Sequence, residues 1–372
     1  MDGTPEDPEQ PRSPTIYDVA KVAGVAPSTV SRAFSRPGRV NAETAARVRG
    51  VAATLGYRAN PMARALLTGR TSMLAVIVSD VTNPFFFEII RGVEAAAAEA
   101  GYVLLLVDTH ESSSDERAAI DRAIPMVDAI VLASSRMSDN AIRMIAKQRP
   151  TVVLNRPMTD VLSVVSDNAG GMRSAVEHLR ELGHQVLTYV AGPEASWAGG
   201  MRWRSIRETA LQLDLRVHRI GPYAPTLAGG LAAVREFAES PTTGVVAYND
   251  LMAIGLMRGL LHGGARIPGD VSVIGFDNIF GSDFCSPPLT TVAAPLRALG
   301  TVAAQMVLKH LASEARGSAR PIDPVRPAML PTQLLVRGST GPRSRRRHPH
   351  SWATTTASPE PAQRTVRQEP PG

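Results

Sequence analysis

Between Ser72 and Thr340 the chain alternates short, β-branched apolar runs with longer amphipathic stretches, and this alternation constrains its fold most strongly. The apolar runs lie at 74–78, 103–107, 129–133, 151–154, 186–190, 245–248 and 271–275, and they are typical of buried parallel strands. The amphipathic stretches lie at 86–100, 116–124, 140–147, 172–182, 200–213, 228–239 and 251–261. Strands alternating with helices predict doubly wound α/β layers. The strands are too many for one small sheet, so we expect two lobes.

Polar side chains gather where the predicted strands end. They are Asp80, Asn83, Asp108, Asn155, Arg156, Asn249, Asp250 and Asp277, with Ser196, Trp197 and Arg202 after the strand that ends near Gly192. In doubly wound sheets, ligands bind beyond the carboxyl ends of the strands. Carboxylates, amides and an arginine suit a polyol, whose sugar ring would stack on Trp197. Each side chain could instead cap a helix or lie in a loop, and Asp167-Asn168 fits a helix cap equally well.

Residues 15–32 carry a different pattern, of two short helices around a tight turn. Thr15 and Asp18 are spaced as a capping pair that opens the first helix, and Gly24 can adopt the left-handed conformation that ends it. Pro27 suits the first turn of a second helix, which turns Val30 inward. The side chains left available to a partner are Pro27, Ser28, Thr29 and Arg32. This spacing predicts a helix-turn-helix that places its second helix in the DNA major groove, although plain bundle corners share it.

The residues that follow favour the DNA-binding interpretation. Asn41 is a good N-cap for a third helix, which Gly56 ends. Nine Lys and Arg residues and only two acidic residues lie between Thr15 and Arg70, so this segment carries more positive charge than the +6 of the whole chain. Concentrated positive charge is typical of a phosphate-binding module.

Residues 57–69 predict a fourth, very short helix, with Asn60 as its cap, Pro61 at its first position and Gly69 at its end. Isolated helices shorter than ~12–15 residues are marginal in water. The segment is therefore either an ordinary linker or a hinge that becomes ordered against DNA and a second copy of the chain.

Several motifs in a fixed order carry a family resemblance. They are Tyr17-Asp-Val-Ala20, Gly24-Val-Ala-Pro-Ser-Thr-Val-Ser-Arg32, Asn60-Pro-Met-Ala-Arg-Ala-Leu66, Asp80-Val-Thr-Asn-Pro-Phe-Phe86, Asp167-Asn168, Asn249-Asp250, Ile274-Gly-Phe-Asp277 and Leu335-Val-Arg-Gly-Ser-Thr340. Together they resemble the lactose-repressor (LacI/GalR) family of bacterial transcription regulators. Ala26 departs from the family, which commonly has a serine cap there; losing a cap costs on the order of 1 kcal/mol.

The resemblance implies a domain organisation. An N-terminal all-α helix-turn-helix DNA-binding domain would span 15–58, a hinge helix 59–71, and a two-lobed, periplasmic-binding-protein-like α/β effector domain 72–340. Lobe 1 would comprise 72–166 and 295–327, and lobe 2 would comprise 167–294 and 328–340. The chain would cross between the lobes near Asp167, Ala294 and Ala328. An acidic tail at 1–14 and a basic tail at 341–372 are expected to be disordered.

The resemblance also implies contact residues. Those implied for DNA are Thr15, Tyr17, Pro27, Ser28, Thr29, Ser31, Arg32, Asn60, Ala63, Arg64 and Leu66. Among them Pro27, Ser28 and Arg32 would face base edges, and Leu66 would wedge into the minor groove. Those implied for the effector are Phe85, Phe86, Asn155, Arg202, Asn249 and Asp277, with Trp197 as a stacking platform. Asn155 stands where the family often has aspartate, so the ligand of a relative is not inherited.

Composition and missing motifs narrow the function. No apolar run reaches the ~18 residues of a membrane span, residues 1–13 lack the pattern of a signal peptide, and the single cysteine, Cys285, excludes a disulfide framework. No nucleophile elbow, Walker loop or His-Glu-x-x-His motif indicates an enzyme. We expect a cytoplasmic, homodimeric repressor, without cofactor or metal, that reads palindromic operator DNA under control of a small ligand. A sugar is favoured over a purine-type corepressor, and an exported, non-enzymatic sugar-binding protein is the rival interpretation.

Overall fold

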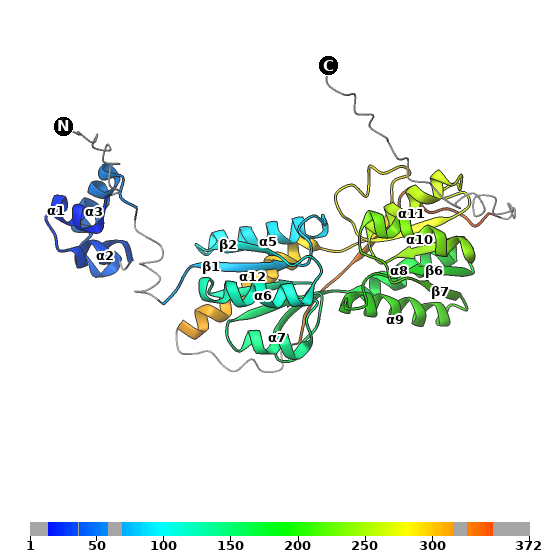
Figure 1. The fold of residues 1–372 in the computed structure, drawn as a ribbon, viewed down its shortest axis with the longest axis horizontal. Coiled ribbons are helices and arrows are strands. Elements are labelled where there is room, and N and C mark those ends of the chain that lie inside the picture. The colour runs from blue at the N-terminus through cyan, green and yellow to red at the C-terminus, as the bar shows by residue number, and fades with distance from the viewer. Residues whose placement is uncertain (1–13, 36, 59–68, 316–325, 345–372) are drawn as a thin grey trace, which may run out of the picture. The chain divides into compact units, whose positions relative to one another are not determined.

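The structure is a computed structural model that describes residues 14–35, 37–58, 69–315 and 326–344. The chain divides into two compact units. The first holds the residues up to Ser72 together with Met126–Asp128, and the second holds the rest (Figure 1). Each unit has its own apolar core.

The first unit is a small helical module. It contains α1 (Ile16–Ala23), α2 (Pro27–Ser35), a 3-10 turn (Pro37–Arg39) and α3 (Ala42–Leu55). The three helices pack around a core of small side chains: Val19, Ala20, Ala23, Val30, Ala33, Ala45, Val48 and Ala52. The predicted hinge helix falls on residues 59–68, which lie outside the described residues.

The first lobe of the second unit contains a six-stranded parallel sheet. Its order is β11-β5-β4-β3-β1-β2. The strands are β1 (Met73–Val78), β2 (Val103–Asp108), β3 (Ala129–Ala133), β4 (Thr151–Leu154), β5 (Leu162–Ser166) and β11 (Ala328–Leu330). The helices are α5 (Phe85–Glu99), α6 (Ser113–Ala123), α7 (Asp139–Ala146) and α12 (Leu296–Ala315), with a 3-10 turn at Ile124–Met126.

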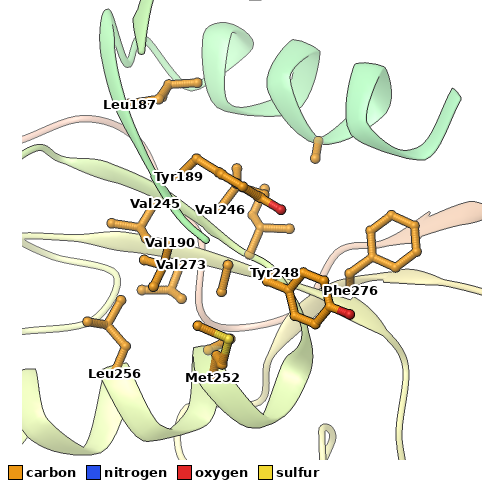
Figure 2. Close-up of a cluster of buried hydrophobic side chains, with 14 of the residues drawn as sticks. Leu187, Tyr189, Val190, Val245, Val246, Tyr248, Met252, Leu256, Val273 and Phe276 are labelled. Carbon is orange, nitrogen blue, oxygen red and sulfur yellow. The ribbon is translucent and has the colours of Figure 1, made fainter. Parts of the chain in front are cut away.

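The second lobe repeats this architecture with one reversed strand. Its sheet order is β12-β10-β9-β8-β6-β7, and only β12 is antiparallel to its neighbour. The strands are β6 (Val186–Val190), β7 (Arg216–Ile220), β8 (Gly244–Ala247), β9 (Ser272–Asp277), β10 (Thr290–Ala293) and β12 (Gln333–Leu335). The helices are α8 (Asn168–Glu181), α9 (Trp197–Gln212), α10 (Leu227–Glu239) and α11 (Asp250–His262). Figure 2 shows the apolar core between these layers.

Close approaches between helices depend on glycine. A Cβ on Gly92 of α5 would lie 2.1 Å from the Arg297 carbonyl of α12, and one on Gly300 of α12 would lie 2.1 Å from the Ile89 carbonyl. In the second lobe, a Cβ on Gly230 of α10 would lie 2.1 Å from the Met252 carbonyl of α11. These pairs of helices are packed more closely than any side chain at those positions would permit.

The architecture confirms the predicted helix-turn-helix and two-lobed α/β class, with one boundary displaced. The chain crosses between the sheets after Ser166, after Ala293 and after Leu330. The third crossing was expected near Ala328, but Ala328–Leu330 pairs with β5 and belongs to lobe 1. The reason is packing, because Ala328 and Leu330 lie against the lobe 1 core.

Candidate nucleic-acid interface and interlobe site

The helix-turn-helix is fixed by local hydrogen bonds. The Asp18 carboxylate accepts the Thr15 backbone N–H and hydroxyl, each at 2.7 Å. Gly24 adopts φ +65° and ends α1. Helix α2 begins without a side-chain cap from Ala26, whose backbone carbonyl accepts the Thr29 N–H at 2.8 Å. The predicted caps therefore set the angle at which α2 is presented.

The predicted DNA contacts of this unit lie away from its core. Tyr17, Pro27, Ser28 and Arg32 are exposed, and Thr15, Thr29 and Ser31 are half-buried. The Tyr17 side chain is 70% exposed, so its ring and hydroxyl are accessible to a binding partner. Among the cationic side chains described for this unit, Arg70 is half-buried and the others are exposed: Lys21, Arg32, Arg39, Arg47, Arg49 and Arg58. This composition suits contact with phosphates. The other predicted contacts, Asn60, Ala63, Arg64 and Leu66, lie outside the described residues.

In the second unit, side chains from both lobes meet in a crevice at the carboxyl ends of the strands. The residues that line it are Asn83, Phe85, Phe86, Glu111, Ser134, Arg136, Asn155, Ala198, Arg202, Pro225, Tyr248, Asn249 and Asp277. Six of the predicted effector contacts are among them: Phe85, Phe86, Asn155, Arg202, Asn249 and Asp277. Trp197 is not. It is half-buried at the first position of α9, and its predicted stacking role has no support in this geometry.

Arg202 is the centre of the lobe 2 side. Its Nε donates to Asn168 Oδ1 at 2.9 Å, one Nη to the Tyr248 carbonyl at 2.5 Å, and the other to Asp277 Oδ1 at 3.1 Å. The guanidinium carbon also lies 3.6 Å from the centroid of the Phe276 ring. Arg202 and Asp277 are both buried. A buried charge is tolerated only with such partners, so these contacts hold the guanidinium in place.

Two buried carboxyl groups lie near one another on this side. Burial raises the pKa of Asp277 to about 6, although the nearby Arg202 opposes the shift. Burial, and then the negative charge of Asp277, raises the pKa of Asp250 to about 8. Asp250 accepts the Ile279 N–H at 2.8 Å and the Thr291 hydroxyl at 2.5 Å and is fully buried. Asp250 therefore supports the loop behind Asp277 and does not line the crevice.

The lobe 1 side carries a second buried arginine, which the sequence did not single out. The Arg136 guanidinium pairs with Glu111 at 2.6 Å, and its backbone N–H donates to Glu116 at 2.9 Å. Arg136 also interacts with Tyr248 of lobe 2. The Tyr248 hydroxyl lies 3.0 Å from Ser196 Oγ. A chain of polar contacts thus spans the crevice.

The two predicted amides are only partly available to a ligand. Asn155 has a positive φ of 59° and contacts Ser134 and Ser166 at 3.4 and 3.5 Å. Asn249 caps α11 by accepting the Met252 N–H at 2.9 Å and donates to the Pro225 carbonyl at 3.1 Å. Asn249 thus serves as a cap while facing the crevice.

Several polar residues at the strand ends have only local roles. The Asp80 carboxylate accepts from Thr82, and Asp108 accepts the His110 N–H. Arg156 donates to the Met137 carbonyl and pairs with Asp139. Asp167 caps α8, while its neighbour Asn168 binds Arg202. The capping interpretation therefore holds for Asp167.

The crevice is closed around its own side chains. The space between them is about 20 Å³, which is room for about one water molecule. A sugar or nucleoside can enter only after the lobes separate or the side chains move. Within the described residues, no cluster of His, Cys, Asp and Glu side chains is arranged to hold a metal ion. Nor does any helix described here have the length and apolar character required to cross a bilayer.

Comparisons with known proteins agree with both units. Residues 15–60 match the family model for bacterial regulatory proteins of the lacI family, and residues 176–340 match that for a periplasmic binding protein-like domain. The HTH-type transcriptional repressor CytR of Escherichia coli K12 is 33% identical over 344 residues, covering 89% of this chain and 98% of CytR. The HTH-type transcriptional regulator CelR of Thermobifida fusca is 32% identical, covering 89% of this chain and 99% of CelR.

Solved structures show the same fold. A Lac repressor dimer bound to operator and an anti-inducer has a TM-score of 0.78 at 24% identity, covering 89% of this chain and all of that one. A CelR–cellobiose complex has a TM-score of 0.64 at 29% identity, covering 88% of this chain and 99% of that one. A LacI family regulator from Enterococcus faecium with bound ribose has a TM-score of 0.63 at 30% identity, covering 73% and 100%.

Proposed function

The chain belongs to the lacI family of bacterial regulatory proteins, and we propose that it is a homodimeric repressor that reads a palindromic operator under control of a sugar or sugar derivative. The observation that carries the proposal is the interlobe crevice, where two buried arginines and two carboxylates face one another across two lobes. The basic helix-turn-helix supplies the DNA-binding surface of the same repressor.

On the DNA side, we assign base contacts to the exposed start of α2. Pro27, Ser28 and Arg32 would face base edges, while Thr15, Tyr17, Thr29 and Ser31 would contact the backbone. An arginine reads guanine with two hydrogen bonds in the major groove. The hinge residues Asn60, Ala63, Arg64 and Leu66 would enter the minor groove, with Leu66 as the wedge between base steps. The family membership and the exposure of the described residues support these roles.

The homodimer is supported by an apolar face of lobe 2. Helices α10 and α11 form a groove lined by Leu227, Leu231 and Leu261, whose side chains are 38%, 54% and 38% exposed. Exposed apolar patches of this kind mark interaction sites. A second copy of the chain is the natural occupant, because a two-fold operator is matched by a two-fold dimer.

The dimer has a direct test. Leu231→Asp should shift the full chain from dimer to monomer in sedimentation experiments and weaken operator binding, because each half-site would then be bound alone. Leu211→Asp provides the matched control, since Leu211 is 82% exposed on α9 and lies outside the groove. A Leu231→Asp protein that stays dimeric would remove this face from the interface.

On the ligand side, the crevice offers the chemistry that a polyol needs. Glu111 and Asp277 accept hydrogen bonds, Arg136 and Arg202 donate them, and Phe85 supplies apolar surface. Two relatives have solved complexes with cellobiose and ribose, which supports a sugar as the ligand class. We therefore keep Phe86, Asn155 and Asn249 as further effector contacts and leave out Trp197.

Control of DNA binding would follow from lobe movement. The ligand must replace contacts such as that between Arg136 and Tyr248, so it can shift the balance between lobe arrangements. If the two arrangements differ in operator affinity, ligand affinity and operator affinity are linked reciprocally. The effector would act on transcription through this linkage.

The effector assignment is tested by screening sugars and nucleosides for thermal stabilisation, because a ligand at 100 times its Kd adds about 2.7 kcal/mol to stability. With the best ligand, Asp277→Asn should lower ligand affinity tenfold or more and leave operator binding without ligand within twofold of wild type. Asp283→Asn, at an exposed carboxylate outside the crevice, is the control. Stabilisation by a purine nucleoside but by no sugar would replace the sugar with a purine.

The operator assignment is tested with fluorescence anisotropy on a palindromic duplex and a scrambled one. Leu66→Ser should reduce operator affinity strongly and leave binding to the scrambled duplex unchanged, because a wedge contributes only when the duplex is kinked. Equal losses on both duplexes would rule out the wedge.

A further inference from the structure

Lobe 2 contains a second cavity that shares no lining residue with the crevice. It has a volume of about 270 Å³ and lies where β6 and β7 end beside the start of α9. Its lining consists of residues 189 and 191–194 from β6 and the following loop, residues 199, 200 and 203 from α9, and Arg219 from β7. Pockets for drug-sized ligands span roughly 300–1,000 Å³, so this cavity suits a compact molecule.

Tyr189 contributes to the wall of this cavity and carries a buried hydroxyl without a partner in the described chain. The Tyr189 side chain is 1% exposed, and its hydroxyl has no hydrogen-bond partner among the described residues. Figure 2 shows its ring projecting from β6, with the hydroxyl at the far end. Burial raises the pKa of Tyr189 well above its usual value, so the phenol keeps its proton and can donate. Leaving such a group unpaired is unfavourable, and a ligand that brings an acceptor relieves the cost.

The remaining walls are aromatic and cationic. The Trp203 and Tyr189 rings are nearly parallel, with centroids 5.7 Å apart. The exposed Arg219 side chain places its guanidinium 5.8 Å from the centroid of the Trp203 ring. The amino end of α9 adds positive potential, since helix dipoles are positive there. Glu194 is the only acidic residue in the lining, and it is exposed to solvent, which screens its negative charge.

We propose that this cavity is an accessory binding site for a small aromatic carboxylate. The carboxylate would bind Arg219, which can hold it with two parallel hydrogen bonds. The flat ring would lie against Trp203 and the bare backbone of Gly199 and Gly200. A ring hydroxyl or carbonyl would accept the hydrogen bond of Tyr189 after a movement of this side chain, because its hydroxyl is buried behind the cavity wall. A sugar lacks the charge for Arg219, and a simple anion such as phosphate lacks the flat apolar body.

The site is tested by isothermal titration of the full chain with 4-hydroxybenzoate, compared with 4-hydroxybenzyl alcohol as the neutral analogue. Saturable binding of the carboxylate, with the alcohol at least tenfold weaker, is expected. Arg219→Gln should weaken binding tenfold or more, whereas Arg216→Gln, on the same edge strand but outside the cavity, should not. Absence of binding, equal binding of the alcohol, or equal effects of the two arginine variants would overturn the proposal.

Two further variants separate the site from general stability. A Cβ on Gly200 meets nothing within 4 Å, so Gly200→Leu should fill the cavity and abolish binding while the lobe stays folded. Gly50→Leu, at an equally open helical glycine of the other unit, is the matched control. Tyr189→Phe should raise the melting temperature of the ligand-free protein and weaken binding, because it removes an unpaired buried hydroxyl. A Tyr189→Phe protein that binds as wild type does would exclude this hydroxyl from the site.

Discussion

The Arg202 network allows a quantitative test of the crevice. Replacement by methionine keeps an unbranched apolar stem in place of the arginine stem. It removes the guanidinium that binds Asn168, the Tyr248 carbonyl and Asp277. Because Asp277 is buried, its carboxylate would lose its counterion. Breaking a buried ion pair by removing one partner costs about 3–5 kcal/mol. We expect Arg202→Met to lower the free energy of unfolding by about that amount.

A double-mutant cycle separates the ion pair from the other lost contacts. Asp277→Asn keeps the shape and one oxygen of the side chain, so it should cost less than Arg202→Met. If the two side chains act as a unit, the double variant should be more stable than the summed losses predict, by about 1–3 kcal/mol. Urea unfolding of the full chain, followed by the fluorescence of Trp197 and Trp203 in lobe 2, measures all four proteins. Additivity within about 0.5 kcal/mol would refute the coupling.

The same cycle has a pH signature. The pKa of Asp277 is raised to about 6 because burial outweighs the attraction of Arg202. A raised carboxyl pKa means that the folded state holds the proton more tightly. The resulting stability is complete below the unfolded pKa of about 3.9 and is lost as the pH rises through the folded pKa. Removing Arg202 raises the pKa of Asp277 further. When the pH rises from 4 to 8, the free energy of unfolding should therefore fall by more in Arg202→Met than in the wild-type protein.

Three other outcomes can be measured on the same protein. Asp250→Asn should flatten the decline of stability between pH 4 and pH 8 that follows from its raised pKa of about 8, and an unchanged decline in urea titrations would contradict that pKa. Gly92→Ala should destabilise by about 1–3 kcal/mol, because the added Cβ would lie 2.1 Å from the Arg297 carbonyl. Gly50→Ala should stabilise by about 0.5–1 kcal/mol, because its helical site is open. Thermal melting measures both glycine variants, and stability changes of the same sign in the two would contradict the packing argument.

Local signals made most of the fold predictable. The caps at Thr15 and Asn41 and the left-handed glycines at 24 and 56 are encoded within a few residues, and the helices of the first unit follow them. The β-branched runs likewise became strands. Five strands escaped prediction. Three of them carry weak signals, because β7 is an edge strand with mostly exposed side chains and β11 and β12 have three residues each. The other two, β5 and β10, are buried, but serine or threonine interrupts their apolar runs. Their pairing is decided by tertiary contacts.

The sequence could predict crevice residues within each lobe, but it could not predict the contacts that join them across the crevice. Asn155, Asn249 and Asp277 follow strands and were found by position alone. Arg136 also follows a strand, β3, and the same rule applied to that strand would have found it. Its pairing with Glu111 and its approach to Tyr248 depend on how the chain folds and how the lobes meet, which no local pattern encodes.

Helix geometry explains why Trp197 lines neither the crevice nor the second cavity. Successive residues of a helix are rotated by about 100°, so side chains four apart share a face and adjacent ones do not. Ala198 and Arg202 are four apart in α9 and both line the crevice, while Gly199, Gly200 and Trp203 line the second cavity. Trp197 lies one position before the crevice face and contributes to neither. Because α9 forms a wall of both cavities, a ligand that shifted this helix from the second cavity would also move Arg202, and the two sites would then be coupled through a single rigid element.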